Sequence, residues 1–484
     1  MVRTFTNERA WPRFTSIEEA LVLCAGGNLL AVGGSSQLQV LQLSAQTSSA
    51  AWPSSSSASD AVRADLLISF DVSAPVAAIA WSPVTSGPQV TMNDAAEEED
   101  NGGFDGMRIE LSVALDDGKV IVFSHAGGST TSLLLGKVSS RVNSMDWINI
   151  DGRSHLAAAQ GDGTLSLWTL EAPETLEEGL TQALDQSSQI YKFSTSLLTV
   201  AFHPQATGTL LVLDAAGSVK MLDWLNPSLP HHKQGKDETV TRPTSGSRKP
   251  RAVHTFIDPV TFAEAHTSNR ANSSALLNGD GSAGLGAASW KPQDENVVGA
   301  LLDGRWCIWD ARTSAGNGLP VERGEAYGSQ GGGGFKWCPT NAQLFLTFST
   351  ASRSSIALGP RLGGSGGDCF SGASPDDVPL TIYDRSSLML SAPRRIARSE
   401  LLPFDADPPA STSPILLNGQ HRTRLAGTSA VRGERVQDVE WIGSALGGGL
   451  RAGAAPGAGA GVGPGLGDVV AVAMGREVIF VGLN

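Results

Sequence analysis

The segment "GALLDGRWCIWDAR", Gly299 to Arg312, carries the pattern that decides the fold. An apolar run reaches the pair Asp303-Gly304, and a second apolar run follows and ends in Trp309-Asp310. Asp-Gly is typical of a tight β-hairpin, because the centre of such a turn needs positive φ, which glycine adopts freely and aspartate tolerates. The segment therefore predicts two short strands joined by a tight turn.

The same hairpin pattern recurs along the chain. Further copies span Leu29–Leu43, Leu111–Ser124, Leu156–Leu170 and Leu210–Trp224. Upstream of the hairpins lie short strands that end in an aromatic residue: Trp81, Trp147, Phe202, Trp290, Trp337 and Trp441. Three strands per unit and a variable fourth strand before the next unit are typical of the blades of a β-propeller.

We therefore expect an all-β chain whose residues 1–484 form a single seven-bladed WD40-type β-propeller. Its blades are predicted to start near residues 18, 75, 138, 196, 283, 333 and 435. The seventh unit has no fourth strand of its own, so we expect the N-terminal segment Val2–Thr6 to supply it and close the ring. Low-complexity insertions are predicted near residues 45–63, 84–107, 226–250, 264–282, 350–379, 404–433 and 443–467. Their Gly-, Ser- and Pro-rich or charged composition predicts long disordered loops.

The repeat changes the interpretation of residues that resemble a site. Asp117, Asp162 and Asp303 look like catalytic acids one at a time, but they share one turn position and are predicted to be turn formers. The six recurring aromatic residues are predicted to pack between blades, and the alternative is a ligand cage. No Gly-His dipeptide accompanies the Trp-Asp pair. We therefore expect apolar packing to hold the blades, with little contribution from a buried Asp–His network.

No catalytic, cofactor-binding or metal-binding residues are predicted. "GGSGG" at residues 363–367 matches the nucleophile motif Gly-x-Ser-x-Gly, but the flanking strand and helix that this motif requires are missing from the pattern. His203 follows a predicted strand and is expected to be structural, and His231-His232 has no ligand partner at useful spacing. The four cysteines, Cys24, Cys307, Cys338 and Cys369, form no Cys-x-x-Cys pair, so we expect buried reduced thiols.

Charge and hydropathy exclude two classes of partner. The formal net charge is −13, which disfavours direct binding to nucleic acid. No basic-then-apolar leader opens the chain, and the longest apolar runs are too short for a membrane span. We therefore expect a soluble intracellular protein with no membrane insertion. The diluted basic tract within residues 231–251 leaves open an import signal or an anion-binding patch.

Several segments, in their order, resemble the thirty-seven-kilodalton WD40 nucleoporin family of the nuclear-pore Y-complex. These are "VAAIAWSP", "LLTVAFHPQATGTLLVLDAAGSVKMLDWL", "AASWKPQDENVVGALLDGRWCIWDAR", "FKWCPTNAQLFLTFST" and "DVEW" followed by "VVAVAMGREVIFV". The resemblance implies a non-enzymatic scaffold of the outer ring at the nuclear pore complex and nuclear envelope, which supports mRNA and protein transport. Its implied partner is a large nucleoporin that combines a propeller with an α-helical solenoid, and through it the other Y-complex subunits. Partner-binding residues remain unknown, because the family's interface has no short motif.

A second hypothesis stays open beside the scaffold. WD40 propellers also serve as peptide-recognition adaptors, such as substrate receptors of ubiquitin ligases or histone readers. Such a reader is expected to place charged or aromatic side chains at the mouth of the central channel. Beside the predicted turns the sequence offers only Lys119 and Arg305.

Overall fold

The computed structural model describes the strand-forming part of the chain. The described residues are 21–26, 28–46, 61–85, 107–171, 189–228, 249–267, 286–292, 294–302, 304–314, 316–326, 333–349, 380–388, 392–396, 436–442, 469–474 and 477–482. Every structural statement below refers to these residues.

The described strands form seven antiparallel sheets, each built from strands that are consecutive in the chain. Sheet 1 contains β1 (Val22–Gly26), β2 (Leu29–Gly33), β3 (Gln37–Gln46) and β4 (Ala61–Asp71). Sheet 2 contains β5 (Val76–Trp81), β6 (Arg108–Leu115), β7 (Lys119–Ala126) and β8 (Ser129–Lys137). Sheet 3 contains β9 (Val142–Ile150), β10 (Arg153–Gln160), β11 (Thr164–Glu171) and β12 (Gln189–Lys192). Sheet 4 contains β13 (Leu197–Phe202), β14 (Thr209–Asp214), β15 (Ser218–Ser228) and β16 (Lys249–Ile257).

The remaining sheets and the helices complete the described fold. Sheet 5 contains β17 (Gly286–Lys291), β18 (Asp294–Leu302), β19 (Arg305–Asp310) and β20 (Glu322–Glu325). Sheet 6 contains β21 (Gly333–Trp337), β22 (Leu344–Ser349), β23 (Leu380–Asp384) and β24 (Arg394–Ile396). Sheet 7 contains β25 (Val436–Ile442), β26 (Val469–Met474) and β27 (Glu477–Gly482). Short helices are α1 (Pro259–Thr267), α2 (Ala311–Ser314) and the 3₁₀ turn η3 (Arg385–Ser387).

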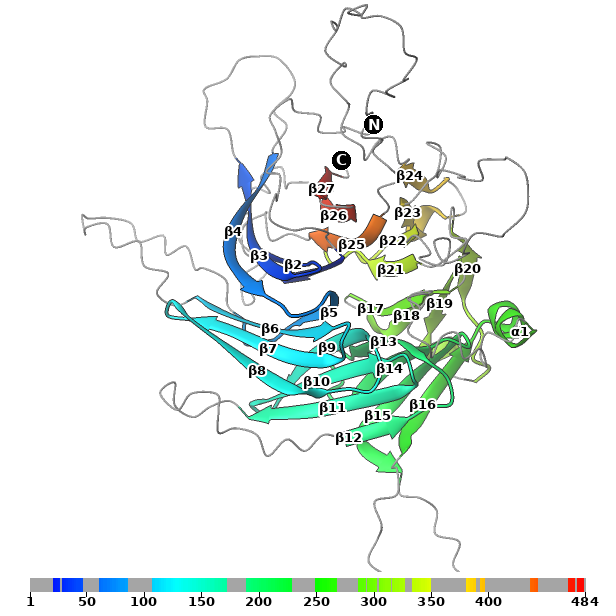
Figure 1. Cartoon of the computed structure of the whole chain (residues 1–484). Helices are drawn as coiled ribbons and strands as arrows, with labels where there is room; N and C mark the ends of the chain where they lie inside the picture. Colours follow the sequence, from blue (N-terminus) through cyan, green and yellow to red (C-terminus); the bar gives the residue numbers. More distant parts are fainter. Residues whose placement is uncertain are drawn as a thin grey trace, which may run out of the picture.

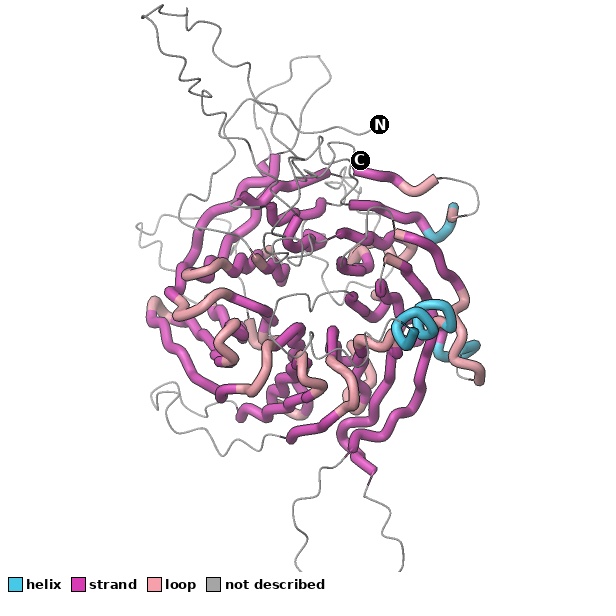
Figure 2. The backbone as a smooth tube through the Cα atoms, turned by 45° about the vertical axis from the view of Figure 1, so that its right-hand side comes forward, coloured by secondary structure: helices cyan, strands magenta, loops and turns pink. Residues whose placement is uncertain are grey.

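The sheets are arranged side by side in a ring, as Figures 1 and 2 show. The first strand of each sheet contacts the first strand of the next sheet, and β25 contacts β1. First strands therefore lie innermost and later strands lie progressively outward. This arrangement is a β-propeller, so the predicted all-β propeller class is confirmed.

The number of complete blades differs from the prediction. The described residues form six complete four-stranded blades where seven were predicted, because sheet 7 has only the three strands β25, β26 and β27. The segment Val2–Thr6, which was predicted to complete the last blade, lies outside the described residues. The predicted insertions also lie almost entirely outside them, although α1 reaches into the one predicted near residues 264–282.

Local turn chemistry explains the regular hairpins. Gly118, Gly163 and Gly304 have φ of 85°, 79° and 76° in the turns between the second and third strands. An L-residue rarely adopts this conformation, so glycine at this position fixes the turn. Asp303 itself lies outside the described residues.

Apolar seams between neighbouring sheets form the core. Around the ring closure, Leu23 and Leu30 of sheet 1 pack with Ile442 and Ala471 of sheet 7 in one buried cluster. The aromatic residue that ends the first strand also lies in such a seam: Trp147, Phe202, Trp290, Trp337 and Trp441 are at most 8% exposed, and Trp81 is half-buried. The structure thus confirms that this set packs between blades.

Most of these indoles also donate a hydrogen bond across the seam. The Nε1–H groups of Trp81, Trp290 and Trp441 donate to the carbonyl oxygens of Cys24, Ala201 and Lys336, at 3.0, 3.3 and 3.3 Å. Each acceptor lies on the first strand of the preceding sheet. The seams are therefore joined by directional bonds as well as by apolar burial.

Two seams depart from this pattern in an instructive way. Trp147 Nε1 donates to Ser112 Oγ at 2.8 Å, and Ser112 Oγ donates onward to the Ala80 carbonyl at 3.4 Å. Gly299 takes the place of Ser112 in sheet 5, since Ala80 pairs with Ser112 and Ser289 pairs with Gly299. Sheet 5 thus offers no hydroxyl at this position, and Trp337 Nε1 has no hydrogen-bond partner among the described residues.

Candidate functional site

One face of the ring carries two kinds of loop. Because the strands alternate in direction, the turns between second and third strands lie at the same end as the connections between sheets. We call this end the turn face. It carries the predicted turn acids Asp117 and Asp162 and the neighbouring Lys119.

Asp117 is engaged in its own turn. Its Oδ1 accepts the backbone N–H of Lys119 at 3.1 Å, and its Oδ2 pairs with Lys119 Nζ at 2.7 Å. The side-chain bond from Lys119 holds the pKa of Asp117 below its usual value. Lys119 Nζ also donates to Ser73 Oγ at 2.9 Å. The predicted turn role of Asp117 is confirmed, and Lys119 is already paired.

Asp162 has the same role in the next blade. Its Oδ1 accepts the backbone N–H of Thr164 at 3.0 Å, while Oδ2 accepts bonds from Ser139 Oγ and Lys192 Nζ, each at 3.0 Å. Burial acts to raise the pKa of Asp162, but the bonds from Thr164, Lys192 and Ser139 outweigh it and the pKa is lowered. Ser139 lies on the connection from sheet 2 to sheet 3, so this bond joins two blades.

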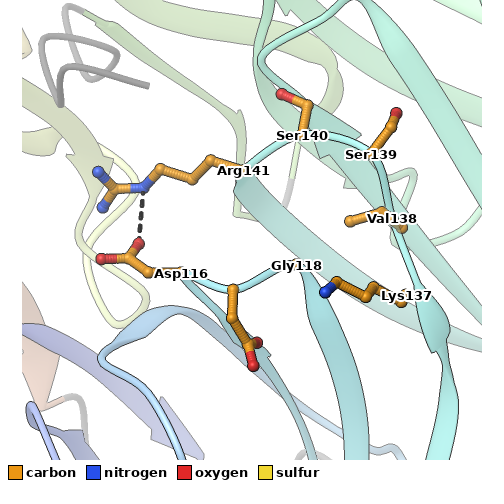
Figure 3. Close-up of a pocket in the computed structure, with 8 residues that line it drawn as sticks. Asp116, Gly118, Lys137, Val138, Ser139, Ser140 and Arg141 are labelled. Atoms are coloured by element: carbon orange, nitrogen blue, oxygen red, sulfur yellow. Dashed lines mark ion pairs between the residues drawn. The ribbon is translucent and has the colours of Figure 1, made fainter. Parts of the chain in front are cut away.

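A groove opens between these elements on the turn face. Its volume is about 470 Å³. It is lined by the β6–β7 turn and the β8–β9 connection through Asp116, Asp117, Gly118, Lys137, Val138, Ser139, Ser140 and Arg141. We call it the turn-face groove. Figure 3 shows Arg141 reaching across to Asp116, and Arg141 Nε lies 3.3 Å from Asp116 Oδ1. Figure 3 also shows the Lys137 ammonium lying beside Gly118.

Two aspartates on the first strands tie neighbouring blades together. Asp146 on β9 accepts the N–H of Phe202 on β13 through Oδ2 at 2.7 Å and the N–H of Trp147 through Oδ1 at 2.9 Å. Burial raises the pKa of Asp146 to about 6, although both bonds act to lower it. Asp438 on β25 makes the equivalent bond to the next sheet at the ring closure, where its Oδ2 accepts the N–H of Leu23 on β1 at 2.9 Å.

The ring closure also holds a half-buried ion cluster. Lys336 on β21 pairs with Glu440 on β25, and Lys336 Nζ lies 3.9 Å from Asp438 Oδ1. We call Lys336, Asp438 and Glu440 the closing cluster. Burial acts to lower the pKa of Lys336, but the two carboxylates outweigh it and raise that pKa. The cluster therefore joins sheets 6, 7 and 1 through charge and hydrogen bonds.

The other residues that the sequence singled out have structural roles or lie elsewhere. His203 is buried, its Nδ1 accepts the N–H groups of Gln205 and Ala206, and its Nε2 lies 2.9 Å from the Glu295 carbonyl. Both ring nitrogens are engaged, which confirms a structural histidine. The sequences at 231–232 and 363–367, most of the basic tract 231–251 and Cys369 lie outside the described residues.

The three described cysteines have free thiols. Cys307 and Cys338 are buried as predicted, whereas Cys24 is only half-buried by exposed area. Burial raises the pKa of Cys24 and of Cys307 to about 12, so both stay protonated at neutral pH.

The described residues contain no group of three or more His, Cys, Asp or Glu side chains placed to hold a metal ion. Among the helices that the structure describes, none has the length and apolar character needed to cross a membrane.

Sequence reasoning missed the turn-face groove, the seam aspartates and the closing cluster. A signal existed for the last two, because "VNSMDW" and "VQDVEW" place Asp146, Asp438 and Glu440 inside otherwise buried first strands. Charged residues at such positions are rare unless they are paired. For the groove, "KVSSRV" at residues 137–142 offered no comparable pattern.

Comparison with known families identifies the propeller. Residues 154–336, from β10 to β21, match the family model described as the nucleoporin NUP37 N-terminal domain. Over these residues the chain is similar to the NUP37 nucleoporins. Its expected resemblance to this nucleoporin family is thereby confirmed, and the match covers most of sheet 3, all of sheets 4 and 5 and most of the first strand of sheet 6. No curated protein matches the chain.

The similarity to this family and the propeller fold together indicate a non-enzymatic scaffold. The engaged state of Asp117, Asp162 and His203 agrees with that role, because each of these polar groups forms hydrogen bonds within the propeller. The chemistry that remains available on the turn face is recognition by charge and hydrogen bonding.

Proposed function

We propose that this protein is a structural subunit of the Y-complex in the outer ring of the nuclear pore. In this role it docks onto a large nucleoporin that combines a propeller with an α-helical solenoid, and through it contacts the other Y-complex subunits. Its location is the nuclear pore complex at the nuclear envelope, and its contribution to mRNA and protein transport is structural.

The match of residues 154–336 to the NUP37 family model carries this proposal. The physical character of the ring supports it. Every described seam buries apolar side chains, and polar bonds from residues such as Trp290 and Asp146 cross several of them. A preformed surface loses little conformational entropy on binding, which suits a scaffold that must hold large partners in fixed positions.

Co-purification and imaging of a tagged full-length chain test the proposal. We expect recovery of Y-complex subunits at moderate salt and fluorescence at the nuclear rim, with a tag-only chain as control. A chain that recovers none of these subunits and is spread evenly through the cell would refute the proposal.

A second function keeps one observation in its favour. The turn-face groove is a concave, charged site beside the connection between sheets 2 and 3. It offers a peptide-recognition adaptor, such as a ubiquitin-ligase substrate receptor or histone reader, a ligand site other than the predicted mouth of the central channel. If the tagged chain recovers ubiquitin-ligase subunits or histones and no Y-complex subunits, the adaptor replaces the scaffold.

We also propose that Val2–Thr6 adds the fourth strand to sheet 7, next to β27. The support is the three-stranded state of this one described sheet and the β-type pattern of the segment. Deleting residues 2–6 is expected to lower the thermal midpoint by several degrees, since an unpaired sheet edge costs stability. An unchanged midpoint would rule out this closure.

A further inference from the structure

The turn-face groove contains two carboxylates, and both are neutralised by neighbours. Asp117 is held by the backbone and ammonium groups of Lys119. Asp116 is paired with Arg141 through Nε. A cationic ligand entering the groove would therefore have to displace an existing ion pair.

The hydrogen-bond donors of the groove are less fully used. Lys137 is exposed and its ammonium makes no hydrogen bond or close ion pair with a described residue, although its charge contributes to lowering the pKa of Asp117. Arg141 is half-buried and engages Asp116 through Nε, which leaves the donors on its two terminal nitrogens available. The hydroxyl of Ser140 makes no hydrogen bond to a described residue either. These three groups line one cavity and all can donate.

We propose that the turn-face groove binds an acidic segment of a partner protein, whose Asp or Glu carboxylates accept bonds from Lys137, Arg141 and Ser140. Local charge supports this choice. Lys137 and Arg141 balance Asp116 and Asp117 in the lining. Lys119 lies beside the lining and pairs with Asp117, which leaves an excess of one positive charge, although the whole chain has a net charge of −13. The groove is therefore a locally positive site on an acidic molecule, and this contrast favours a short acidic segment over a broadly acidic surface.

Carboxylate is the ligand chemistry that fits these donors best. An arginine offers a planar fork that pairs with both carboxylate oxygens, and a lysine adds a compact charge beside it. The cavity of about 470 Å³ is large enough for one or two side chains of a peptide and too small for a folded domain. This inference does not depend on which large subunit the protein binds.

Fluorescence anisotropy on the full-length protein tests the proposal. The probe is a fluorescein-labelled octapeptide with four consecutive glutamates flanked by glycines, and the control peptide has glutamine in place of each glutamate. We expect the acidic peptide to bind and the glutamine peptide to bind at least about fivefold more weakly, as for a few exposed ion pairs. Equal affinity for the two peptides would overturn the proposal.

Three variants locate the binding in the groove. Lys137→Gln is expected to weaken binding of the acidic peptide about threefold, the effect of losing one exposed ion pair. Lys192→Gln is the matched control, because Lys192 lies on the same face but is already paired with Asp162, and it should change the affinity less than 1.5-fold, about 0.2 kcal/mol or less. Asp116→Asn is expected to strengthen binding, since it removes a like charge. A weaker Asp116→Asn variant, or equal effects of Lys137→Gln and Lys192→Gln, would contradict the assignment.

Two further peptides distinguish other occupants. A lysine peptide that binds better than the glutamate peptide would show that Asp116 and Asp117 dominate, and the proposal would fail. A phosphoserine peptide that binds more than about tenfold tighter would reassign the groove to phosphorylated partners and so overturn the acidic segment. Each variant's thermal midpoint confirms that its fold is retained.

Discussion

Gly299 illustrates how a single missing side chain can decide a seam. An added Cβ at this position would lie 2.2 Å from Cε1 and Cζ of Phe335 and 3.0 Å from Trp337 Nε1. The Phe335 ring therefore packs directly on the backbone of β18. Glycine is required there by close approach, since no positive φ is involved.

Gly299→Ala tests this packing. We expect a loss of about 1–3 kcal/mol in the free energy of unfolding, because the methyl group has no room beside Phe335. Gly316→Ala is the control, since a Cβ there meets nothing within 4 Å and should change stability by less than about 0.5 kcal/mol. Urea denaturation of both variants measures the difference, and equal stabilities would contradict the predicted clash.

Asp146 predicts a pH dependence with a definite sign. Its pKa in the folded protein is about 6, above the value of 3.8 for a free aspartate. A raised pKa means that the folded state binds the proton more tightly. This contribution is complete below about pH 4 and is lost as pH rises to about 6.

The Asp146→Asn variant isolates this contribution from the other carboxylates. We expect the stability of the parent protein, relative to the variant, to fall between pH 4 and pH 6 and to stay level above pH 7. Urea midpoints of both proteins at each pH provide the measurement. A relative stability that stays level in this window would show that Asp146 titrates at the free value, and one that rises with pH would show that it titrates below it.

At the scale of the element, the tryptophan near the end of the first strand in five of the sheets contributes to stability in two ways. It fills the seam with a large apolar ring, and in four seams its N–H also bonds to the preceding sheet. Trp337 only fills its seam, because its Nε1 has no hydrogen-bond partner among the described residues.

Two matched substitutions separate the packing of the ring from the hydrogen bond of its N–H. Trp147→Phe and Trp337→Phe both shorten an indole to a phenyl ring, but only the first removes a hydrogen bond. We expect Trp147→Phe to cost about 1 kcal/mol more than Trp337→Phe in the free energy of unfolding. Chemical denaturation compares the two, and a larger loss for Trp337→Phe would mean that its N–H has a partner.

How well the sequence predicts an interaction depends on how far apart its two residues lie along the chain. The turn acids Asp117 and Asp162 were predictable, because a turn is decided by residues next to each other. The bond from the Phe202 N–H to Asp146 was not predictable, since Asp146 lies 56 residues away and only the assembled ring brings the two residues together. The turn-face groove escaped prediction for the same reason, because it is formed by two loops that share no local pattern.

At the scale of the whole molecule, the ring closes on the closing cluster. Lys336, Asp438 and Glu440 come from sheets 6 and 7, and Asp438 also holds Leu23 of sheet 1. The propeller class followed from the repeat alone. The number of complete blades did not follow from the repeat, since the described part of sheet 7 has three strands.

Lys336→Met is expected to destabilise the ring by about 2 kcal/mol, because it leaves the half-buried Glu440 carboxylate without its partner. The double variant Lys336→Met/Glu440→Gln should recover at least half of that loss, since the uncompensated charge is gone. Urea denaturation measures both. A double variant less stable than the single one would show that Glu440 has another cationic partner.

Limited proteolysis tests the architecture as a whole. Composition predicts that cleavage falls within the insertions near residues 45–63, 84–107, 226–250, 350–379, 404–433 and 443–467. The fragments are expected to co-elute in size-exclusion chromatography, because the seams hold neighbouring blades together. Early cleavage inside β9–β15, or separation of the fragments, would argue against a closed ring.

The bond from Leu23 to Asp438 has a consequence for biosynthesis. The two residues are 415 positions apart, and at ribosomal rates of about 5–20 residues per second Leu23 waits roughly 20–80 s for its acceptor. During that interval the apolar face of sheet 1, with Leu30 and Val32, has no sheet 7 to cover it. The nascent chain is therefore expected to bind chaperones until translation has passed β26, and to be released when the last sheet arrives.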